Sequence, residues 1–473
     1  MATSNKNRVT ILLIAVTILL YFFFGYNLER TQFFKFIILY VVLFSTYFYF
    51  IKRNANNFQF LLGISILFRL VFLFSIPNLS QDFYRFIWDG RMLLEGLNPY
   101  LSLPETFINQ HSFPVNQAID LYAGMGELNG SHYTNYPPIN QLCFLIAAIF
   151  ANKSIIGSVV IMRLLIIFAD VGILYFGKKI LVHLKLPVHT IFWYILNPFI
   201  IIEMTGNLHF EPVMLFFLVW AIYLLFKNKW VWAAVLIACS ITVKLIPFLF
   251  LPLFFQWFVK KKVIANKMKQ SPHNDEKKPK ITGFLKLIAF YTIVIATTIT
   301  LFLPFYSSEL IQNYSNSVGL WFRNFEFNAS FYYVFREIGY QFRGYNEIAI
   351  IGKIIPILTI LFVGYITFFR KNSTPKQLIT ALLFGLSFYY FTTTTMHPWY
   401  LATLILLSVF TKYRFPIIWS MVIVLSYSAY SNEVYKENLI LISLEYIVVY
   451  GFLFWEIFMK DKINFNRKSI NTV

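Results

Sequence analysis

The chain has 473 residues, of which 58% are hydrophobic and only 13% carry a charged side chain. This composition excludes an ordinary soluble protein and indicates a polytopic membrane protein. The net charge of +19 does not indicate a nucleic-acid partner, because the lysines stand in short segments between apolar runs, as in the cytoplasmic loops of membrane proteins.

The chain opens with an apolar run over residues 9–27, which follows Lys6 and Arg8. This start resembles a signal peptide, but no small-residue cleavage site follows it. We therefore interpret the run as a retained transmembrane helix.

Two further apolar runs, residues 33–51 and 58–77, flank a turn that contains Lys52 and Arg53. Basic residues in a short loop place that loop in the cytoplasm. With the N-terminus inside, three crossings bring the chain to the outer face at residue 78.

Residues 78–138 form the first long polar segment, with six acidic residues and two arginines. An acidic segment here agrees with an extracytoplasmic location. Tyr136 is followed by Pro137 and Pro138, and prolines fit the first turn of a helix, where a missing N–H costs nothing. The next run, 139–151, is too short to span a membrane comfortably, so we expect a helix along the outer surface.

Eleven more apolar runs give about 14 expected transmembrane helices in total. We predict an all-α polytopic membrane protein in which residues 1–473 form a single integral-membrane domain. Within it, 78–138 is an extracytoplasmic loop with the catalytic segment, and 260–281 is a basic cytoplasmic loop. The eleven runs are 157–177, 189–205, 210–226, 230–243, 245–259, 282–304, 347–369, 377–395, 398–411, 416–430 and 439–459.

Ionisable residues gather just after the third run. Asp82, Arg85 and Asp89 are spaced i, i+3 and i+7, which places them on one face of a helix. Ionisable groups at the mouth of a bilayer are costly to desolvate, so their default interpretation is functional. We interpret Asp82 as a catalytic base, with a helix N-cap as the alternative. Asp89 is a second catalytic candidate, with pairing to Arg85 as the alternative.

Cationic residues suit a phosphate group. The guanidinium forks of Arg85 and Arg91 match phosphate geometry, although the two lie on different helix faces, so one of them is expected only to support the loop. Lys244 stands within an apolar stretch, where a lysine must snorkel or meet an anion.

Polar turns later in the chain fall on the same predicted outer face. His209 and Glu211 occupy a short turn that either binds sugar hydroxyls or is only a capped turn. The segment Trp321–Asn328 is typical of a membrane interface, with sugar stacking as the alternative. The segment 397–400 begins a helix. The candidate substrate-binding residues are Arg85, Arg91, Tyr136, His209, Glu211, Lys244, Arg323, His397 and Tyr400.

Motifs for cofactors are missing from the sequence. It has no Walker loop, no HExxH and no glycine-rich nucleotide fingerprint, which disfavours a soluble nucleotide-sugar donor. Cys143 and Cys239 show no metal-ligand spacing. Phe83 and Tyr84 follow Asp82, so a strict Asp-x-Asp pair is absent. We expect no cofactor; a divalent metal is possible but unsupported.

These residues together resemble the GT-C glycosyltransferases. The run Asp82-Phe-Tyr-Arg-Phe-Ile-Trp-Asp-Gly-Arg91 resembles the bacterial polyprenyl-phosphate-mannose-dependent mannosyltransferases, and it is similar to the first mannosyltransferase of GPI-anchor assembly. Shorter matches follow in the expected order: His209-Phe-Glu211, Lys244-Leu-Ile-Pro247 and His397-Pro-Trp-Tyr400.

The resemblance implies a GT-C-like bundle with surface helices in a long outer loop. It also implies an inverting transfer of a hexose, with mannose the first expectation, from a polyprenyl-phosphate donor to a glycan or lipid acceptor on the outer face of the membrane. We expect a multi-pass protein of the bacterial inner membrane. Two alternatives remain open: a flippase or transporter for lipid-linked oligosaccharides, and an O-antigen-type polymerase.

Overall fold

The computed structural model describes residues 2–260, 278–323, 325–432 and 434–460. Within these ranges the chain is built from helices, and its β-type contact is an isolated bridge between Phe327 and Thr395. The predicted all-α class is therefore confirmed. Most of the basic loop predicted at 260–281 lies outside the described residues.

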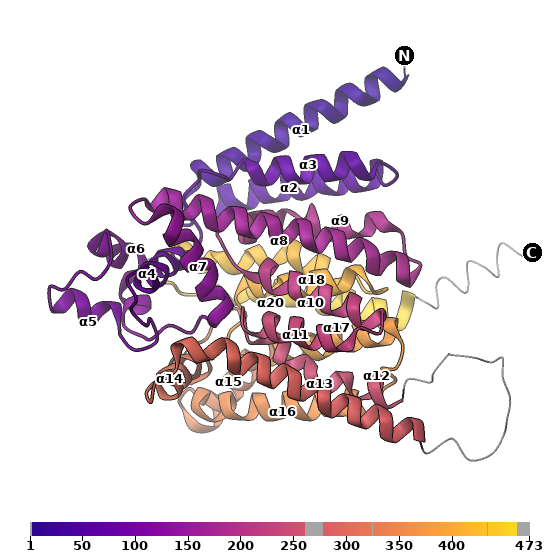
Figure 1. The fold of residues 1–473 in the computed structure, drawn as a ribbon. Helices are drawn as coiled ribbons and strands as arrows, with labels where there is room; N and C mark the ends of the chain where they lie inside the picture. Colours follow the sequence, from indigo (N-terminus) through magenta and orange to yellow (C-terminus); the bar gives the residue numbers. More distant parts are fainter. Residues whose placement is uncertain (1, 261–277, 324, 433, 461–473) are drawn as a thin grey trace, which may run out of the picture.

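Long helices run side by side through the body of the molecule, and both ends of the described chain lie toward the same end of it (Figure 1). The helices of this bundle are α1 (Ala2–Tyr26), α2 (Phe33–Arg53), α3 (Phe58–Leu70), α8 (Ile155–Leu184), α9 (Phe192–Ile195), η2 (Ile200–Gly206), α10 (Glu211–Phe226), α11 (Trp230–Ile241), η3 (Ile246–Phe254), α12 (Phe255–Val259), α13 (Lys278–Phe302), α16 (Ile348–Phe369), α17 (Pro375–Thr392), η5 (Pro398–Leu401), α18 (Ala402–Val409), α19 (Phe415–Val422), η6 (Ile423–Ser431), α20 (Leu439–Phe454) and η7 (Trp455–Met459).

The expected count of about 14 spans is not confirmed. Among the described residues six helices are long and apolar enough to cross a membrane, and the bent pair Val188–Ile195 and Ile200–Gly206 would make a seventh. Several predicted spans fold instead as apolar helices of 10–17 residues. Much of α10 is buried inside the bundle. A helix apolar all round fits a protein core as well as a membrane span, so composition alone does not fix the count.

A layer of shorter helices covers the other end of the bundle (Figure 1). Four of them fall in the segment predicted as the first outer loop and its surface helix. This layer contains α4 (Asp82–Leu94), α5 (Pro104–Asn109), α6 (Ala118–Gly130), α7 (Pro138–Ala151), α14 (Leu310–Arg323) and α15 (Phe331–Arg343).

The helices α4 and α7 pack unusually closely. A Cβ added at Gly90 would lie 2.3 Å from the backbone oxygen of Phe144, so only glycine fits at this contact. One turn earlier, the ring of Phe86 stacks on that of Phe144, with centroids 4.6 Å apart. This contact fixes the rotation of α4 and so decides which of its charged side chains face outward.

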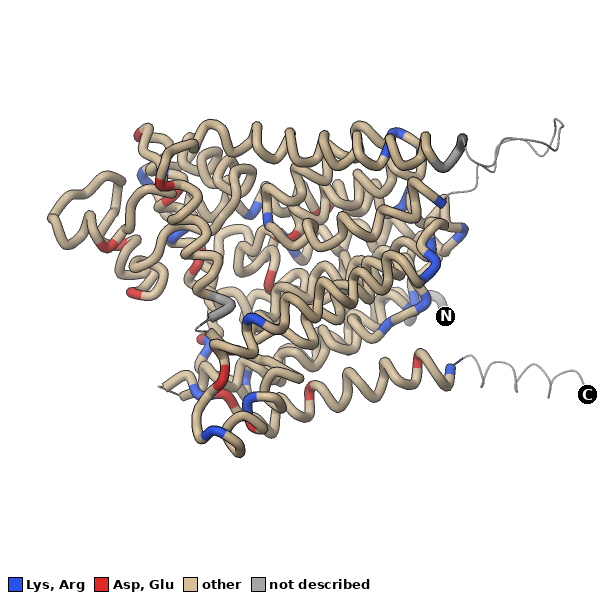
Figure 2. Tube along the Cα trace, turned by 90° about the horizontal axis from the view of Figure 1, so that it is seen from below, with Lys and Arg blue, Asp and Glu red and all other residues tan. Residues whose placement is uncertain are grey.

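Charges are distributed unevenly along the bundle. Figure 2 shows many of the Lys and Arg residues near the end that carries both termini, whereas several Asp and Glu residues lie at the opposite end, with the surface helices. Basic residues mark the cytoplasmic ends of membrane proteins. The chain is a multi-pass membrane protein whose surface layer lies at the end away from this basic rim.

Candidate active site

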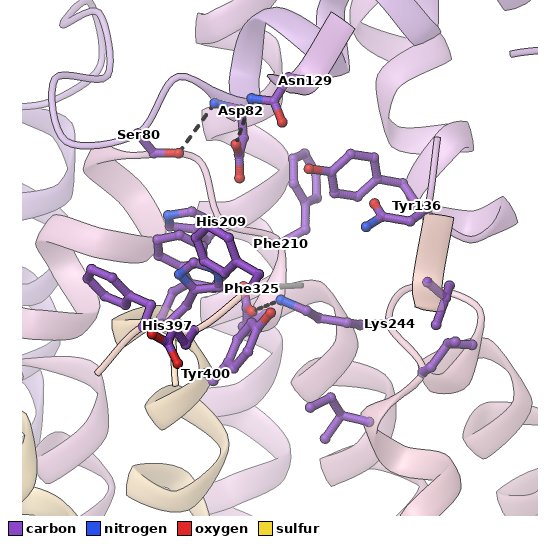
Figure 3. Close-up of a pocket in the computed structure, with 18 of the residues that line it drawn as sticks. Ser80, Asp82, Asn129, Tyr136, His209, Phe210, Lys244, Phe325, His397 and Tyr400 are labelled. Carbon is purple, nitrogen blue, oxygen red and sulfur yellow. Dashed lines mark hydrogen bonds and ion pairs between the residues drawn. The ribbon is translucent and has the colours of Figure 1, made fainter. Parts of the chain in front are cut away.

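A cavity of about 1100 Å³ lies where the surface layer meets the bundle (Figure 3). Its walls come from segments that are far apart in the sequence. It brings together eight of the eleven predicted site residues: Asp82, Arg85, Tyr136, His209, Glu211, Lys244, His397 and Tyr400.

The backbone leading into α4 is held by two asparagines. The Asn207 side-chain oxygen accepts hydrogen bonds from the backbone N–H groups of Asn78 (3.2 Å) and Leu79 (3.0 Å). The Asn78 amide donates to the carbonyls of Phe24 and Leu28, both at 2.7 Å. The segment before Asp82 is thereby tied both to the end of α1 and to the turn that carries His209.

That turn has its own anchor in Arg163, a fully buried residue of α8. The Arg163 guanidinium donates to the carbonyls of Thr205 (2.7 Å), Gly206 (2.8 Å) and Leu73 (2.9 Å). Carbonyl groups left free at the ends of short helices carry partial negative charge, so they satisfy a cation that would otherwise be costly in a membrane protein. Arg163 thus joins the two segments that carry Asp82 and His209.

Asp82 stands in the first turn of α4, and its carboxylate points into the cavity (Figure 3). Burial raises the pKa of Asp82 above its ordinary value, and the charge of Glu211 raises it further. A hydrogen bond donated by the Asn129 amide, at 3.4 Å, and the charge of Lys244 act in the opposite direction. A carboxylate with a raised pKa is a stronger base than a solvated one.

Lys244 forms an ion pair with Glu211. Glu211 begins α10, where the helix dipole favours a negative charge, and Lys244 follows the C-terminal end of α11, where the dipole favours a positive one. The Lys244 ammonium lies 4.6 Å from the centre of the Tyr400 ring. The Lys244 side chain keeps 31% of its exposure and Glu211 only 3%, so the lysine is the partner that can reach a ligand in the cavity.

Three rings form a stack beside this pair. The ring of Trp399 lies between His209, at 4.0 Å and 16°, and His397, at 4.5 Å and 5°. Burial lowers the pKa of His397 to about 3, and it lowers that of His209 well below its usual range; the Lys244 charge adds to both shifts. Both imidazoles are therefore neutral at physiological pH. They can exchange hydrogen bonds with a sugar but do not add positive charge.

Arg85 lines the cavity, but its hydrogen bonds are directed into the protein. It pairs with Asp89 at 2.8 Å and donates to the carbonyls of Asn129 (2.6 Å) and His132 (2.9 Å). Its contact with Asn129 positions the residue that bonds Asp82. These contacts fit a positioning role for Arg85, and its predicted phosphate contact stays a prediction.

Asp89 and Arg91 do not line the cavity. Asp89 is fully buried and accepts hydrogen bonds from Arg85 and from the Gln141 amide at 2.9 Å. Arg91 is fully buried and donates to the carbonyl of Asn116 and to Gln117. Because the contact at Gly90 seats α4 on α7, this part of the helix faces the protein. Asp89 and Arg91 therefore have structural partners in this arrangement, and the catalytic role predicted for Asp89 and the ligand-binding role predicted for Arg91 stay predictions.

Arg323 is the last residue of α14. Its side chain lies outside what the structure describes, so its predicted substrate contact stays a prediction.

Known proteins match the part of the chain that carries Asp82, Glu211 and Lys244. Residues 27–260 match the family described as Alpha-(1->6)-mannopyranosyltransferase, N-terminal domain. This match spans just under half of the chain and supports the predicted resemblance to the GT-C mannosyltransferases. A stretch of 186 residues is 24% identical to Alpha-(1->6)-mannopyranosyltransferase A of Mycobacterium tuberculosis. That match covers 39% of this chain and 34% of the relative, so the chain aligns with about a third of that protein.

The family match includes the acid and the cation of this GT-C site, since Asp82, Glu211 and Lys244 all fall within residues 27–260. His397 and Tyr400 come from the region beyond it. The predicted family is therefore confirmed on the part of the chain that carries the central pair of charges.

Sequence reasoning missed several residues that shape the GT-C cavity. Asn129 bonds Asp82, Asn207 and Arg163 hold the backbone around it, and Trp399 forms the centre of the ring stack. Two of these residues carried a signal in the sequence. Trp399 stands inside the block 397–400, and Arg163 is an arginine inside an apolar run, which must have partners.

Metal binding at this GT-C site was left open by the sequence. Among the described residues, no three His, Cys, Asp or Glu side chains form a group able to hold a metal ion. Whether a metal takes part stays a prediction.

Proposed function

We propose that this chain is an inverting mannosyltransferase. It would move mannose from a polyprenyl-phosphate donor to an acceptor at the outer face of a bacterial inner membrane. The observation that carries the proposal is one cavity in which a buried carboxylate, Asp82, and a partly exposed cation, Lys244, face the same space. The family match supports mannose as the transferred sugar.

An apolar wall of the cavity suits a polyprenyl chain. It is formed by Leu245 and residues of η3, α16 and α17, including Phe248, Pro356 and Leu386. Ile360, on the membrane-spanning helix α16, lines the cavity and is also 69% exposed. The wall therefore continues to the lipid-facing surface, where a lipid can enter from the side.

The position of the cavity favours chemistry on the outer side. The surface layer lies away from the basic rim and the termini (Figure 2). A donor carried by a lipid on that side needs no soluble nucleotide, which agrees with the missing nucleotide motifs.

The proposed reaction is one displacement. The Asp82 carboxylate takes the proton from an acceptor hydroxyl as its oxygen bonds to the anomeric carbon. The bond from that carbon to the phosphate oxygen breaks, and polyprenyl phosphate leaves with the electron pair. Attack and departure occur on opposite faces, so the configuration inverts. Proton transfer to a positioned base is worth about 10²–10⁴-fold, and Lys244 stabilises the negative charge that develops on the phosphate.

The test uses the purified protein in lipid with a short-chain polyprenyl-phosphate mannose and octyl α-mannoside. We expect polyprenyl phosphate to be released together with a mannosylated product, both measured by mass spectrometry. Parallel reactions use the glucose and arabinose donors. If none of the three donors is consumed, the transferase proposal is wrong; consumption of only glucose or arabinose would contradict the choice of mannose.

The raised pKa of Asp82 predicts a pH effect. The base acts only when ionised, so kcat/KM should fall as the pH drops through this pKa. Asn129→Ala removes a hydrogen bond that favours the ionised form. The acid limb of the pH–rate profile should therefore move to higher pH in this variant.

The control for this shift is Asn109→Ala, an exposed site at the end of α5. Its profile should coincide with that of the unchanged protein. An acid limb that is the same in all three proteins would mean that a group other than Asp82 controls the reaction.

A further inference from the structure

The cavity has a second polar wall, which the proposed displacement does not use. We call it the tyrosine–glutamate wall; it consists of Glu326, Tyr333, Arg336, Tyr430 and Glu437. These residues come from α15, from the segment before it, from η6 and from the segment between η6 and α20. They all lie beyond the part of the chain that matches the family.

The carboxylates of this wall are held in place. Glu326 pairs with Arg336 at 2.5 Å and accepts a hydrogen bond from the Tyr332 hydroxyl at 2.6 Å. Glu437 accepts from the Tyr333 hydroxyl and from the backbone N–H of Asn328 at 2.6 Å. Carboxylates fixed in this way present their remaining lone pairs to the cavity at little further entropy cost.

Aromatic faces accompany these acids. Arg336 lies over the Tyr333 ring, 4.4 Å from its centre. Arg30, which also lines the cavity, lies 5.0 Å from the centre of the Tyr430 ring and 5.7 Å from that of Tyr435. Fixed carboxylates next to flat ring faces match a sugar, which offers hydroxyl donors on its edge and C–H groups on its face.

This wall adjoins the catalytic base. Asp82, Tyr430 and Glu437 all line the same cavity. Arg30 also shares a small hollow with Ser80 and Gln81, directly before Asp82. A sugar held by the wall would therefore lie within reach of the group that removes its proton.

The helix α15 has two unlike faces. Val334, Phe335, Ile338 and Phe342 are exposed apolar residues at 47–84%, while Tyr333 and Arg336 line the cavity. An apolar face opposite a polar one is typical of a helix lying in a membrane interface. The wall is thus placed at the lipid surface, where an acceptor can approach along the membrane.

We propose that the tyrosine–glutamate wall is the acceptor subsite and that it takes an uncharged glycan. This inference rests on the proposed function, because inversion requires the acceptor and the phosphate on opposite faces of the anomeric carbon. Lys244 marks the phosphate side and Asp82 the acceptor side. At the acceptor side Glu326 is paired with Arg336, whereas Glu437 is held by hydrogen bonds from Tyr333 and Asn328. The charge of Glu437 disfavours an anionic headgroup, and its oxygens accept hydrogen bonds from hydroxyls, so the wall selects against a phospholipid acceptor.

The experiment compares Glu437→Gln and Tyr333→Phe with the unchanged protein, using octyl α-(1→6)-mannobioside as acceptor probe. We expect the KM for this probe to rise about 10- to 100-fold in Glu437→Gln, as for a lost hydrogen bond to a charged group. A smaller rise is expected for Tyr333→Phe. The KM for the donor and the slow hydrolysis of the donor by water should stay within about twofold, because these do not use the wall.

Glu337→Gln, on the exposed side of α15, is the matched control and should leave every constant unchanged. An unchanged probe KM in both wall variants would overturn the inference. So would an equal loss of transfer and donor hydrolysis, since a purely structural effect lowers both. If the unchanged protein consumes no donor at all, the proposed function itself fails, which is a distinct result.

A second experiment offers phosphatidylglycerol as the competing acceptor and should give no product. Transfer of the sugar to this lipid would also contradict an uncharged-glycan subsite.

Discussion

Asp82→Asn is expected to lower mannosyl transfer by about 10²–10⁴-fold, the range for losing a positioned general base. The change removes the base but keeps the shape of the side chain, and the carbonyl oxygen of the new amide can still accept the hydrogen bond from Asn129. The measurement is the release of polyprenyl phosphate under saturating donor, so that the loss is read in kcat.

The fold should survive this change, because a neutral amide is less costly to bury than a carboxylate whose pKa is already raised by burial. Thermal unfolding of the variant is therefore expected at or above the temperature of the unchanged protein. Asp120→Asn, an exposed position on α6, is the control and should retain full activity. Full turnover by a folded Asp82→Asn variant would remove Asp82 from the mechanism.

Much of this site could be predicted because its chemistry follows short sequence blocks. Asp82, Glu211 and Lys244 each stand at a helix end next to apolar residues, so composition alone marks them as costly and functional. The structure brings these blocks to one cavity. Their convergence also agrees with the sequence analysis, in which counting the membrane crossings placed all three residues on the outer face.

The rotation of α4 was less predictable. The spacing of Asp82, Arg85 and Asp89 indicates one helix face, but it does not say how far that face extends into the cavity. The close contact at Gly90 and the amide of Gln141 turn Asp89 toward the protein. Both features depend on where α7 packs, and a sequence pattern within α4 contains no information about that.

The number of spans could not be read from composition for a related reason. A run of apolar residues is favoured equally by lipid and by the inside of a bundle. Much of α10 is buried by its neighbours, and its sequence does not distinguish this from contact with lipid. The backbone carbonyls that accept hydrogen bonds from Arg163 could not be predicted either. Every residue has a carbonyl, and only the fold decides which of them lie next to the guanidinium.

Lys244→Met should lower kcat/KM by about 10²–10³-fold, because a preplaced charge that stabilises the developing phosphate is lost. Methionine keeps most of the apolar stem, so packing changes little. The substitution also leaves Glu211 without its partner. For fully buried pairs this costs about 3–5 kcal/mol; here the cost should be smaller, because the Lys244 side chain is 31% exposed.

The double variant Lys244→Met with Glu211→Gln separates these two effects. Removing the second charge relieves the buried, unpaired carboxylate, so the unfolding temperature should return toward that of the unchanged protein. Activity should not return with it, because the phosphate still lacks its cation. Recovery of both would mean that Lys244 matters only as the structural partner of Glu211, and the phosphate side of the proposed displacement would then have to be sought at another cation of the cavity.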